Sequence, residues 1–171
     1  MLPNLSQYPL LAPRYLSLAG AAVCAFSMLF AVLYLQQALG MEACPLCIFQ
    51  RVAFVAAGVI FLLAGLHNPK GLGLKVYAFF ALLSSLAGLL VAGRHVWLQY
   101  LPADQVPACG PGLNYMLDVF PMNDVLDMVL NGSGECAEVS WRLLGLSIPE
   151  WAVLLFVGLA GLSLLQLFRR Q

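Results

Sequence analysis

The amino-acid sequence predicts an all-α membrane protein whose single domain, residues 1–171, is a bundle of four transmembrane helices. Its 171 residues are 62% hydrophobic and 9% charged, whereas a soluble domain is roughly half apolar and about a quarter charged. The apolar residues fall into four blocks, each near the roughly 20 residues that cross a bilayer. We expect helices in all four, because a lone strand exposed to lipid leaves its backbone groups unpaired. The net charge of zero gives no sign of a nucleic-acid partner.

The four expected spans cover residues of about 15–35, 45–66, 72–93 and 149–168. The first is long enough to cross a bilayer and lacks the small-x-small cleavage site of a signal peptide, so we expect a helix and not a leader. The second and third spans are joined by a cluster of helix-breaking residues, His67-Asn68-Pro69-Lys70-Gly71. The third and fourth spans are separated by a long polar stretch, residues 94–148, which we expect to form a loop outside the membrane.

This long loop contains apolar residues at helical spacing on both sides of Pro121: Leu113, Met116, Leu117 and Phe120 before it, and Val125, Leu126, Val129 and Leu130 after it. The pattern predicts a short amphipathic helix, which either lies on the membrane surface or packs on the bundle. Its polar face is acidic, which argues against binding to anionic lipid. The next residues, Asn131-Gly132-Ser133-Gly134, are expected to form a flexible hinge.

The charged residues predict how the chain crosses the membrane. The outer ends of the chain and the second connection hold five basic residues and no acid: Arg14, Lys70, Lys75, Arg169 and Arg170. All eight acids lie on the opposite side: Glu42, Asp104, Asp118, Asp124, Asp127, Glu135, Glu138 and Glu150. The positive-inside rule therefore puts both termini in the cytoplasm. It puts the Cys44 end of the second span and the 94–148 loop outside, where disulfides persist.

Four cysteines form two pairs on that outer side, and they suggest thiol–disulfide chemistry. Cys44 and Cys47 flank Pro45-Leu46, and Cys109 and Cys136 lie in the long loop. Pro45 suits the first position of a helix, which makes Cys44 the expected N-cap and places Cys47 in the first turn. The partial positive charge of a helix N-terminus favours a reactive thiolate. The fifth cysteine, Cys24, lies in the middle of the first span and is expected to be an inert packed thiol.

Arg51 lies four residues after Cys47, on the same helix face. An arginine inside an apolar span is energetically costly and marks a functional candidate, here a fixed cation for a Cys47 thiolate or for a nearby acceptor. The alternative is a side chain that extends to the outer headgroups. Zinc is the competing chemistry for the cysteines. We expect no metal site, because structural zinc sites usually show two close pairs and Cys109 and Cys136 are 27 positions apart.

Two stretches resemble the signatures of a known family. They are Cys44-Pro-Leu-Cys-Ile-Phe-Gln-Arg51 and Gly134-Glu-Cys-Ala-Glu-Val-Ser-Trp141, the latter followed by Leu144-Gly-Leu and Pro149-Glu-Trp151. The chain thereby resembles DsbB, a multi-pass protein of the bacterial inner membrane. The resemblance covers nearly the whole chain. It implies reoxidation of a periplasmic DsbA-like dithiol oxidase and transfer of the electrons to a membrane quinone, ubiquinone or menaquinone.

The resemblance also implies a role for each matching residue. Cys109 would be the cysteine that the DsbA-like partner attacks, and Cys136 its pair, which passes the oxidation state on through Cys44. Cys47 would lie next to the quinone, supported by Arg51. His95, just past the expected third helix, resembles a histidine near the quinone, or is an interfacial histidine beside Arg94 and Trp97. The family often has an acid before the arginine, and this chain departs from that pattern because it has Gln50.

Two other functions compete with this one. The first is a quinone reductase like the vitamin K epoxide reductases, in which the loop pair usually precedes the Cys-x-x-Cys; here Cys109 and Cys136 follow it. The second is a non-enzymatic membrane protein with structural disulfides or zinc. It predicts cysteines inert to dithiothreitol, or metal in the purified protein.

Overall fold

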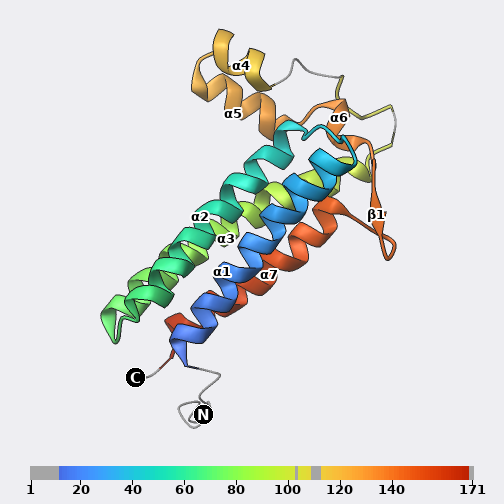
Figure 1. Cartoon of the computed structure of the whole chain (residues 1–171). Coiled ribbons are helices and arrows are strands. Elements are labelled where there is room, and N and C mark those ends of the chain that lie inside the picture. The colour runs from blue at the N-terminus through green and yellow to red at the C-terminus, as the bar shows by residue number, and fades with distance from the viewer. Residues whose placement is uncertain (1–11, 103, 109–112, 170–171) are drawn as a thin grey trace.

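Four long helices dominate the computed structural model, which describes residues 12–102, 104–108 and 113–169 (Figure 1). They are α1 (Pro13–Leu29), continued by the π-helix η3 (Phe30–Ala38), α2 (Pro45–His67), α3 (Leu72–Gln99) and α7 (Ile148–Leu167). All four spans are long and apolar enough to cross a membrane, which confirms the predicted class. The start of α1, the α2–α3 connection and the end of α7 lie at one end of the bundle, and the loop helices lie at the other.

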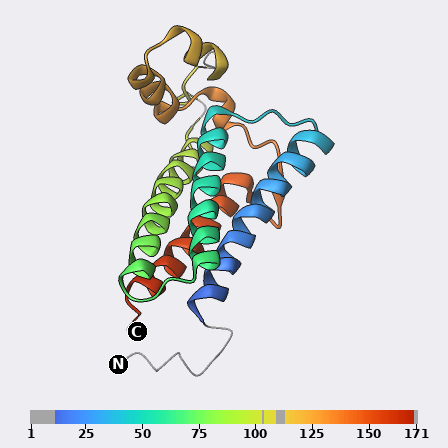
Figure 2. The same cartoon turned by 60° about the vertical axis from the view of Figure 1, so that its left-hand side comes forward.

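The helices pack unevenly around the bundle. α2 contacts both α1 and α3, and α3 contacts α7 extensively, whereas α1 and α7 touch at few places. Figure 2 shows that the η3 end of the first span stands away from α2 and α7. Phe30, Ala31 and Leu35 of this splayed end line a cavity beside the N-terminus of α2.

Small residues let α1 and α2 approach closely, as in many membrane bundles. A Cβ at Gly58 would meet the Cβ of Cys24 at 2.9 Å, and one at Gly65 would meet Cδ2 of Leu18 at 2.6 Å. Cys24 is buried in the main core of the bundle. The expectation that its thiol is packed is therefore confirmed.

Gly88→Ala in α3 is expected to destabilise the fold. An added Cβ would lie 2.3 Å from the ring of Phe156, which is fully buried and stacks on Phe54 with ring centroids 4.1 Å apart. Such overpacking typically costs about 1–3 kcal/mol. The thermal midpoint in detergent, followed by circular dichroism, measures it. Gly93→Ala, in the same helix with nothing within 4 Å of its Cβ, is the control, and equal midpoints for the two variants contradict the prediction.

The third helix is longer than expected, and this corrects the loop boundary. It was expected to end near residue 93 but continues to Gln99. Arg94 ends the apolar run in the sequence, but the helix can continue because this side chain has partners. Its Nε and Nη2 donate to the carbonyls of Leu130 and Asn131, each at 3.0 Å. The first span also exceeds its predicted end near residue 35, because η3 extends it to Ala38.

The long loop forms three short helices, α4 (Leu113–Val119), α5 (Met122–Asn131) and α6 (Gly134–Ala137). One face of them builds a second core at the end of the bundle, with these buried residues: Leu46, Leu98, Met116, Val125, Val129 and Cys136. Other apolar side chains of the same helices are exposed, including Leu117, Met122 and Leu126. The predicted amphipathic helix thus occurs as two helices separated at Pro121, and one of their faces packs on the bundle.

The segment before Cys136, which we expect to be a flexible hinge, forms a turn that lies close to Leu98. Gly132 has φ +79°, a conformation that favours glycine. A Cβ there would lie 2.2 Å from Cδ1 of Leu98. Ser133, which follows, is buried and caps α6. Glycine at position 132 therefore lets the turn before Cys136 lie close to the side chain of Leu98.

A short hairpin that the sequence analysis did not anticipate precedes α7. Its strands are β1 (Arg142–Leu143) and β2 (Leu146–Ser147), antiparallel, with Leu144 and Gly145 both at positive φ in the turn. The indole Nε1 of Trp151 donates to the carbonyl of Leu143 at 3.2 Å. This bond ties the hairpin to the start of α7, beside the splayed end of the bundle (Figure 1).

Candidate redox site

The N-terminus of α2 presents two cysteines as predicted. Cys44 is the N-cap, Pro45 occupies the first turn, and the Sγ of Cys44 accepts a hydrogen bond from the backbone N–H of Cys47 at 3.3 Å. Both thiols are free, with their Sγ atoms 3.0 Å apart. The Cys-x-x-Cys motif is therefore a dithiol at the positive end of a long helix, where a thiolate is favoured.

Cys136 approaches this dithiol from the loop. Its Sγ lies within 4.8 Å of the Sγ of Cys44 and of a ring nitrogen of His95, and its side chain is fully buried. The hydrogen bond to Cys44, together with burial, raises the pKa of the Cys136 thiol. In the dithiol state Cys136 therefore keeps its proton and donates it toward Cys44. Cys44 thus has one potential disulfide partner on its own helix and another on the loop.

Cys109 lies outside the described residues, but its predecessor does not. The carbonyl of Ala108 accepts a hydrogen bond from the backbone N–H of Gly134 at 3.4 Å. The chain leading to Cys109 therefore runs beside the residue two positions before Cys136. This neighbourhood is compatible with the predicted pairing of the two loop cysteines.

His95 lies inside α3, and its side chain points inward. Its side chain is 3% exposed. Nε2 lies 3.9 Å from the Sγ of Cys44, and Nδ1 lies 3.9 Å from the Sγ of Cys47. The histidine is therefore next to both thiols of the motif.

Gln50 orients that histidine. Its Nε2 lies 3.0 Å from Nδ1 of His95, and its side chain is buried. When the amide donates to Nδ1, the proton of the neutral ring is on Nε2, which faces Cys44. Sequence reasoning noted only that an acid was missing at this position. The signal available was spacing, because Gln50 lies three residues after Cys47 and thus on the same face.

Arg51 joins α2 to η3. Its Nη1 donates to Oε1 of Gln36 at 2.7 Å, and its Nη2 donates to the carbonyl of Ala31 at 3.4 Å. Both acceptors belong to the π-helix, and π-helical segments are rare and concentrate at functional sites. The guanidinium is thereby fixed at the edge of the cavity that contains Cys47.

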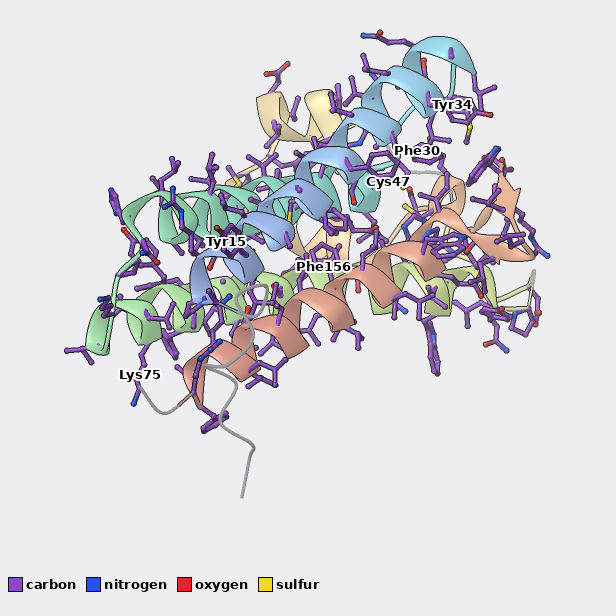
Figure 3. The ribbon with its side chains drawn as sticks, turned by 60° about the horizontal axis from the view of Figure 1, so that its bottom comes forward. Tyr15, Phe30, Tyr34, Cys47, Lys75 and Phe156 are labelled. Carbon is purple, nitrogen blue, oxygen red and sulfur yellow. The ribbon has the colours of Figure 1, made fainter. Side chains whose placement is uncertain are left out.

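A cavity of about 710 Å³ connects these groups. Cys44, Cys47, Gln50, Arg51 and His95 line it, together with residues of α1, η3 and α7. Figure 3 shows Cys47 and Phe30 at the same end of the molecule, with Tyr15 and Lys75 at the other.

Aromatic side chains form the mouth of this cavity. The ring of Phe30 stacks on that of Tyr34, with centroids 5.2 Å apart, and Trp141 approaches Phe30 at 5.7 Å. Phe30 and Trp141 both line the cavity. The sequence analysis used Trp141 only as part of a motif and missed both other residues, because their proximity depends on the hairpin and on η3.

The chain is similar to proteins of one family throughout its length. The family model described as "DsbB: Disulfide bond formation protein DsbB" matches residues 13–166. Disulfide bond formation protein B of Nitrosococcus oceani is 53% identical over 159 residues, 93% of this chain and 94% of that protein. The protein of the same name from Hahella chejuensis is 55% identical over 144 residues, 84% and 83% of the two chains. That from Acinetobacter baumannii is 55% identical over 138 residues, 80% and 81%.

Proposed function

Because the chain belongs to the disulfide bond formation protein DsbB family, we propose that it reoxidises a periplasmic DsbA-type dithiol oxidase and passes the electrons to membrane quinone. The family and the four apolar helices make it a multi-pass bacterial membrane protein with disulfide oxidoreductase chemistry. One observation supports the relay above all others. Cys44 lies within reach of both Cys47 and Cys136, beside a cavity that contains Arg51.

The thiol steps form a chain of exchanges. A thiolate of the reduced partner attacks Cys109 in the Cys109–Cys136 disulfide, and Cys136 leaves as the thiolate. The second partner thiolate attacks the mixed disulfide, which releases an oxidised partner and a reduced Cys109. The loop pair is reoxidised when Cys136 attacks Cys44 in the Cys44–Cys47 disulfide, which releases Cys47. Cys109 then attacks Cys136 and releases Cys44. The electron pair from the partner now resides on the Cys44–Cys47 dithiol.

The environment of the sulfurs favours this direction. The rate and direction of exchange depend on which thiol leaves best as a thiolate. The raised pKa of Cys136 makes it a poor leaving group in exchanges between the two pairs, so its attack on Cys44 is favoured over the reverse step. Cys47 lies in the first turn of α2 and shares the cavity with Arg51, so its negative charge is stabilised. Electrons therefore move from the loop toward the cavity.

The cavity fits a quinone acceptor. Its volume of about 710 Å³ is within the range of about 300–1,000 Å³ that small-molecule sites occupy. Apolar side chains such as Phe26, Phe54 and Leu155 line it, together with a few polar groups. A bound quinone supplies a two-electron acceptor that is soluble in the bilayer. Arg51 holds a positive charge against developing negative charge there, and His95 holds a proton at Nε2 beside Cys44.

The orientation in the inner membrane follows from charge. Lys70 and Lys75 lie at the end of the bundle opposite Cys47 (Figure 3), and Arg14 begins α1 at that same end. The positive-inside rule assigns that end to the cytoplasm. The thiols then face the periplasm, where the partner is soluble and disulfides persist.

Arg51→Met is expected to raise the quinone concentration needed for half-maximal turnover by about tenfold or more, because a hydrogen bond from a charged group contributes about 1.5–3 kcal/mol. Turnover at saturating partner and a series of quinone concentrations measures it. Arg51→Lys, which keeps the charge but not the fork of donors, is expected to fall between. An unchanged quinone requirement in Arg51→Met favours the alternative in which this arginine serves only the headgroup region.

The function itself is tested with purified protein, a reduced DsbA-like partner and a ubiquinone analogue. We expect partner thiols to disappear in step with quinone reduction, two thiols for each quinone, and only with all three components present. If partner oxidation is no faster than without the membrane protein, the proposed function fails.

A further inference from the structure

We propose that the fully reduced site binds a thiophilic divalent cation of the Zn²⁺ class through Cys44, His95 and Cys136, and that this binding holds the protein in its dithiol state. The binding site stands on geometry alone. The inhibitory consequence rests on the proposed function.

The three ligand atoms are already gathered. One ligand atom from each of these residues lies within 4.8 Å of the other two, and the Sγ of Cys44 is 3.9 Å from Nε2 of His95. Zinc binds thiolate sulfur at about 2.3 Å and imidazole nitrogen at about 2.0–2.1 Å in a tetrahedron. The edges of that tetrahedron are about 3.6–3.8 Å long. Side-chain shifts of about 1 Å or less therefore close the site around an ion.

The three ligands come from separate elements that the fold holds together. Cys44 caps α2, His95 lies in the last turns of α3, and Cys136 lies in α6. Cys136 is fully buried in the second core, and His95 is 3% exposed. The three ligands are therefore already together in the folded protein. The arrangement matches catalytic zinc sites, which have three protein ligands and a fourth position left for another group.

Gln50 supplies the support that a metal-bound histidine needs. A histidine that ligates through Nε2 carries its proton on Nδ1 and usually donates it to a fixed acceptor. The amide of Gln50 is 3.0 Å from Nδ1. A 180° turn of the amide exchanges its nitrogen for its oxygen, so the same contact then accepts that proton. Gln50 is thus a positioning residue for either state of the ring.

The fourth position lies toward the cavity. Cys44 and His95 both line the cavity, and so does Cys47, whose Sγ is 3.0 Å from that of Cys44. An ion on the three ligands is therefore adjacent to the site that we assign to the acceptor. An ion that enters through the cavity can therefore reach Cys44 and His95 without displacing the side chains that bury Cys136.

The site exists only in the reduced protein. Metal ligation needs thiolates, and Cys44 has none when it is bonded to Cys47 or to Cys136. Binding releases the thiol protons of Cys44 and Cys136, and no electrons move. While the ion is bound, the sulfur of Cys44 is not available to either disulfide partner. The ion therefore stops the relay in its reduced state, after the electrons of the partner have reached the cysteines and before the disulfides are formed again.

The binding test uses protein reduced with dithiothreitol, freed of reductant without air, and titrated with Zn²⁺ against a chromophoric chelator. Cd²⁺ in a parallel titration reports thiolate ligation by its ultraviolet charge-transfer absorption. We expect one ion for each reduced protein and none at the same affinity for the oxidised protein. Cys136→Ser and His95→Ala are expected to weaken binding at least tenfold. Gln50→Leu is expected to weaken it by about 10–100-fold, with Gln50→Glu retaining it.

The matched control is Cys24→Ala, because Cys24 is an equally buried cysteine far from the ligands in the main core; its binding should be unchanged. Equal affinity in Cys136→Ser and the unaltered protein overturns the site, since it shows that Cys136 is not a ligand. Equal affinity in the oxidised protein also overturns it.

The inhibitory part has its own readout. Zn²⁺ added during turnover with partner and quinone analogue is expected to stop partner oxidation, and a chelator is expected to restore it. Binding without inhibition overturns the inhibitory part and leaves the site standing. A protein that binds the ion but shows no turnover even without it contradicts the proposed function, not the metal site.

Discussion

Cys136→Ala is expected to abolish oxidation of the periplasmic partner while quinone still oxidises the Cys44–Cys47 pair. Cys136 is the loop sulfur that lies within 4.8 Å of Cys44, so its removal breaks the connection between the loop and the membrane pair. It also leaves Cys109 without a disulfide for the partner to attack. The Cys44–Cys47 dithiol and the cavity remain, because Cys136 does not line that cavity in the part of the chain that the structure describes.

Two measurements separate these halves. Partner oxidation in the presence of a quinone analogue should fall to the rate without the protein. Free thiols are labelled before and after quinone is added to the reduced variant. Cys44 and Cys47 should take up the label before the addition and not after it, because they have then formed a disulfide. Cys109→Ala should behave in the same way, because it breaks the same loop pair. Cys24→Ala is the control for loss of a buried thiol and should keep full activity. Partner oxidation at a normal rate in either loop variant would show that the order of the two pairs is wrong.

Much of the fold could be predicted because lipid imposes a simple rule on sequence. Spans of apolar residues must be helical, and all four predicted starts fall within two residues of the observed ones, the first three of which are Pro13, Pro45 and Leu72. The fourth is Ile148, one residue before the predicted start. The rule fails at helix ends. Arg94 and His95 interrupted the apolar run, yet the helix continues to Gln99.

The reason for that failure is that each of the two polar residues has a partner that is distant in sequence. Arg94 donates to carbonyls at the end of α5, and His95 meets Gln50 and Cys44. A hydropathy profile treats every polar side chain as unfavourable in a membrane span, because it contains no information about hydrogen-bond partners elsewhere in the chain. Hydropathy also gave no sign of η3 or the hairpin, beside which Phe30 and Trp141, distant in sequence, come into contact.

The sequence predicted the redox chemistry of the candidate site, but it did not predict which of its residues lie in contact. Pro45 predicted that Cys44 is the N-cap of a helix, and the structure confirms that. The approach of Cys136 to Cys44 depends on the packing of the loop helices and on the turn at Gly132. Gln50 was set aside because it is not an acid, although an amide can hold His95 equally well.

Cys47→Ala is expected to stop continuous turnover completely and to limit the protein to about one equivalent of oxidised partner. The loop disulfide can still oxidise one partner, because that exchange uses Cys109 and Cys136. It cannot be renewed, since Cys44 has lost the sulfur 3.0 Å away with which it forms the disulfide that quinone restores. A stoichiometric assay with excess partner and quinone analogue measures this limit.

The same variant should trap a disulfide that the complete relay passes through. Cys44 remains within 4.8 Å of Cys136, and no second sulfur on α2 resolves a bond between them. Before partner is added, peptide mapping without reductant should therefore find a share of the protein with Cys44 linked to Cys136 and Cys109 free, in exchange with the loop disulfide that oxidises the one equivalent of partner. Val52→Ala is the control on the same helix, because Val52 is 62% exposed and lies on the lipid-facing side of α2; it should turn over normally. Continued turnover of Cys47→Ala beyond one equivalent would mean that another sulfur faces the acceptor. The direction of electron flow from loop to cavity would then have to be assigned anew.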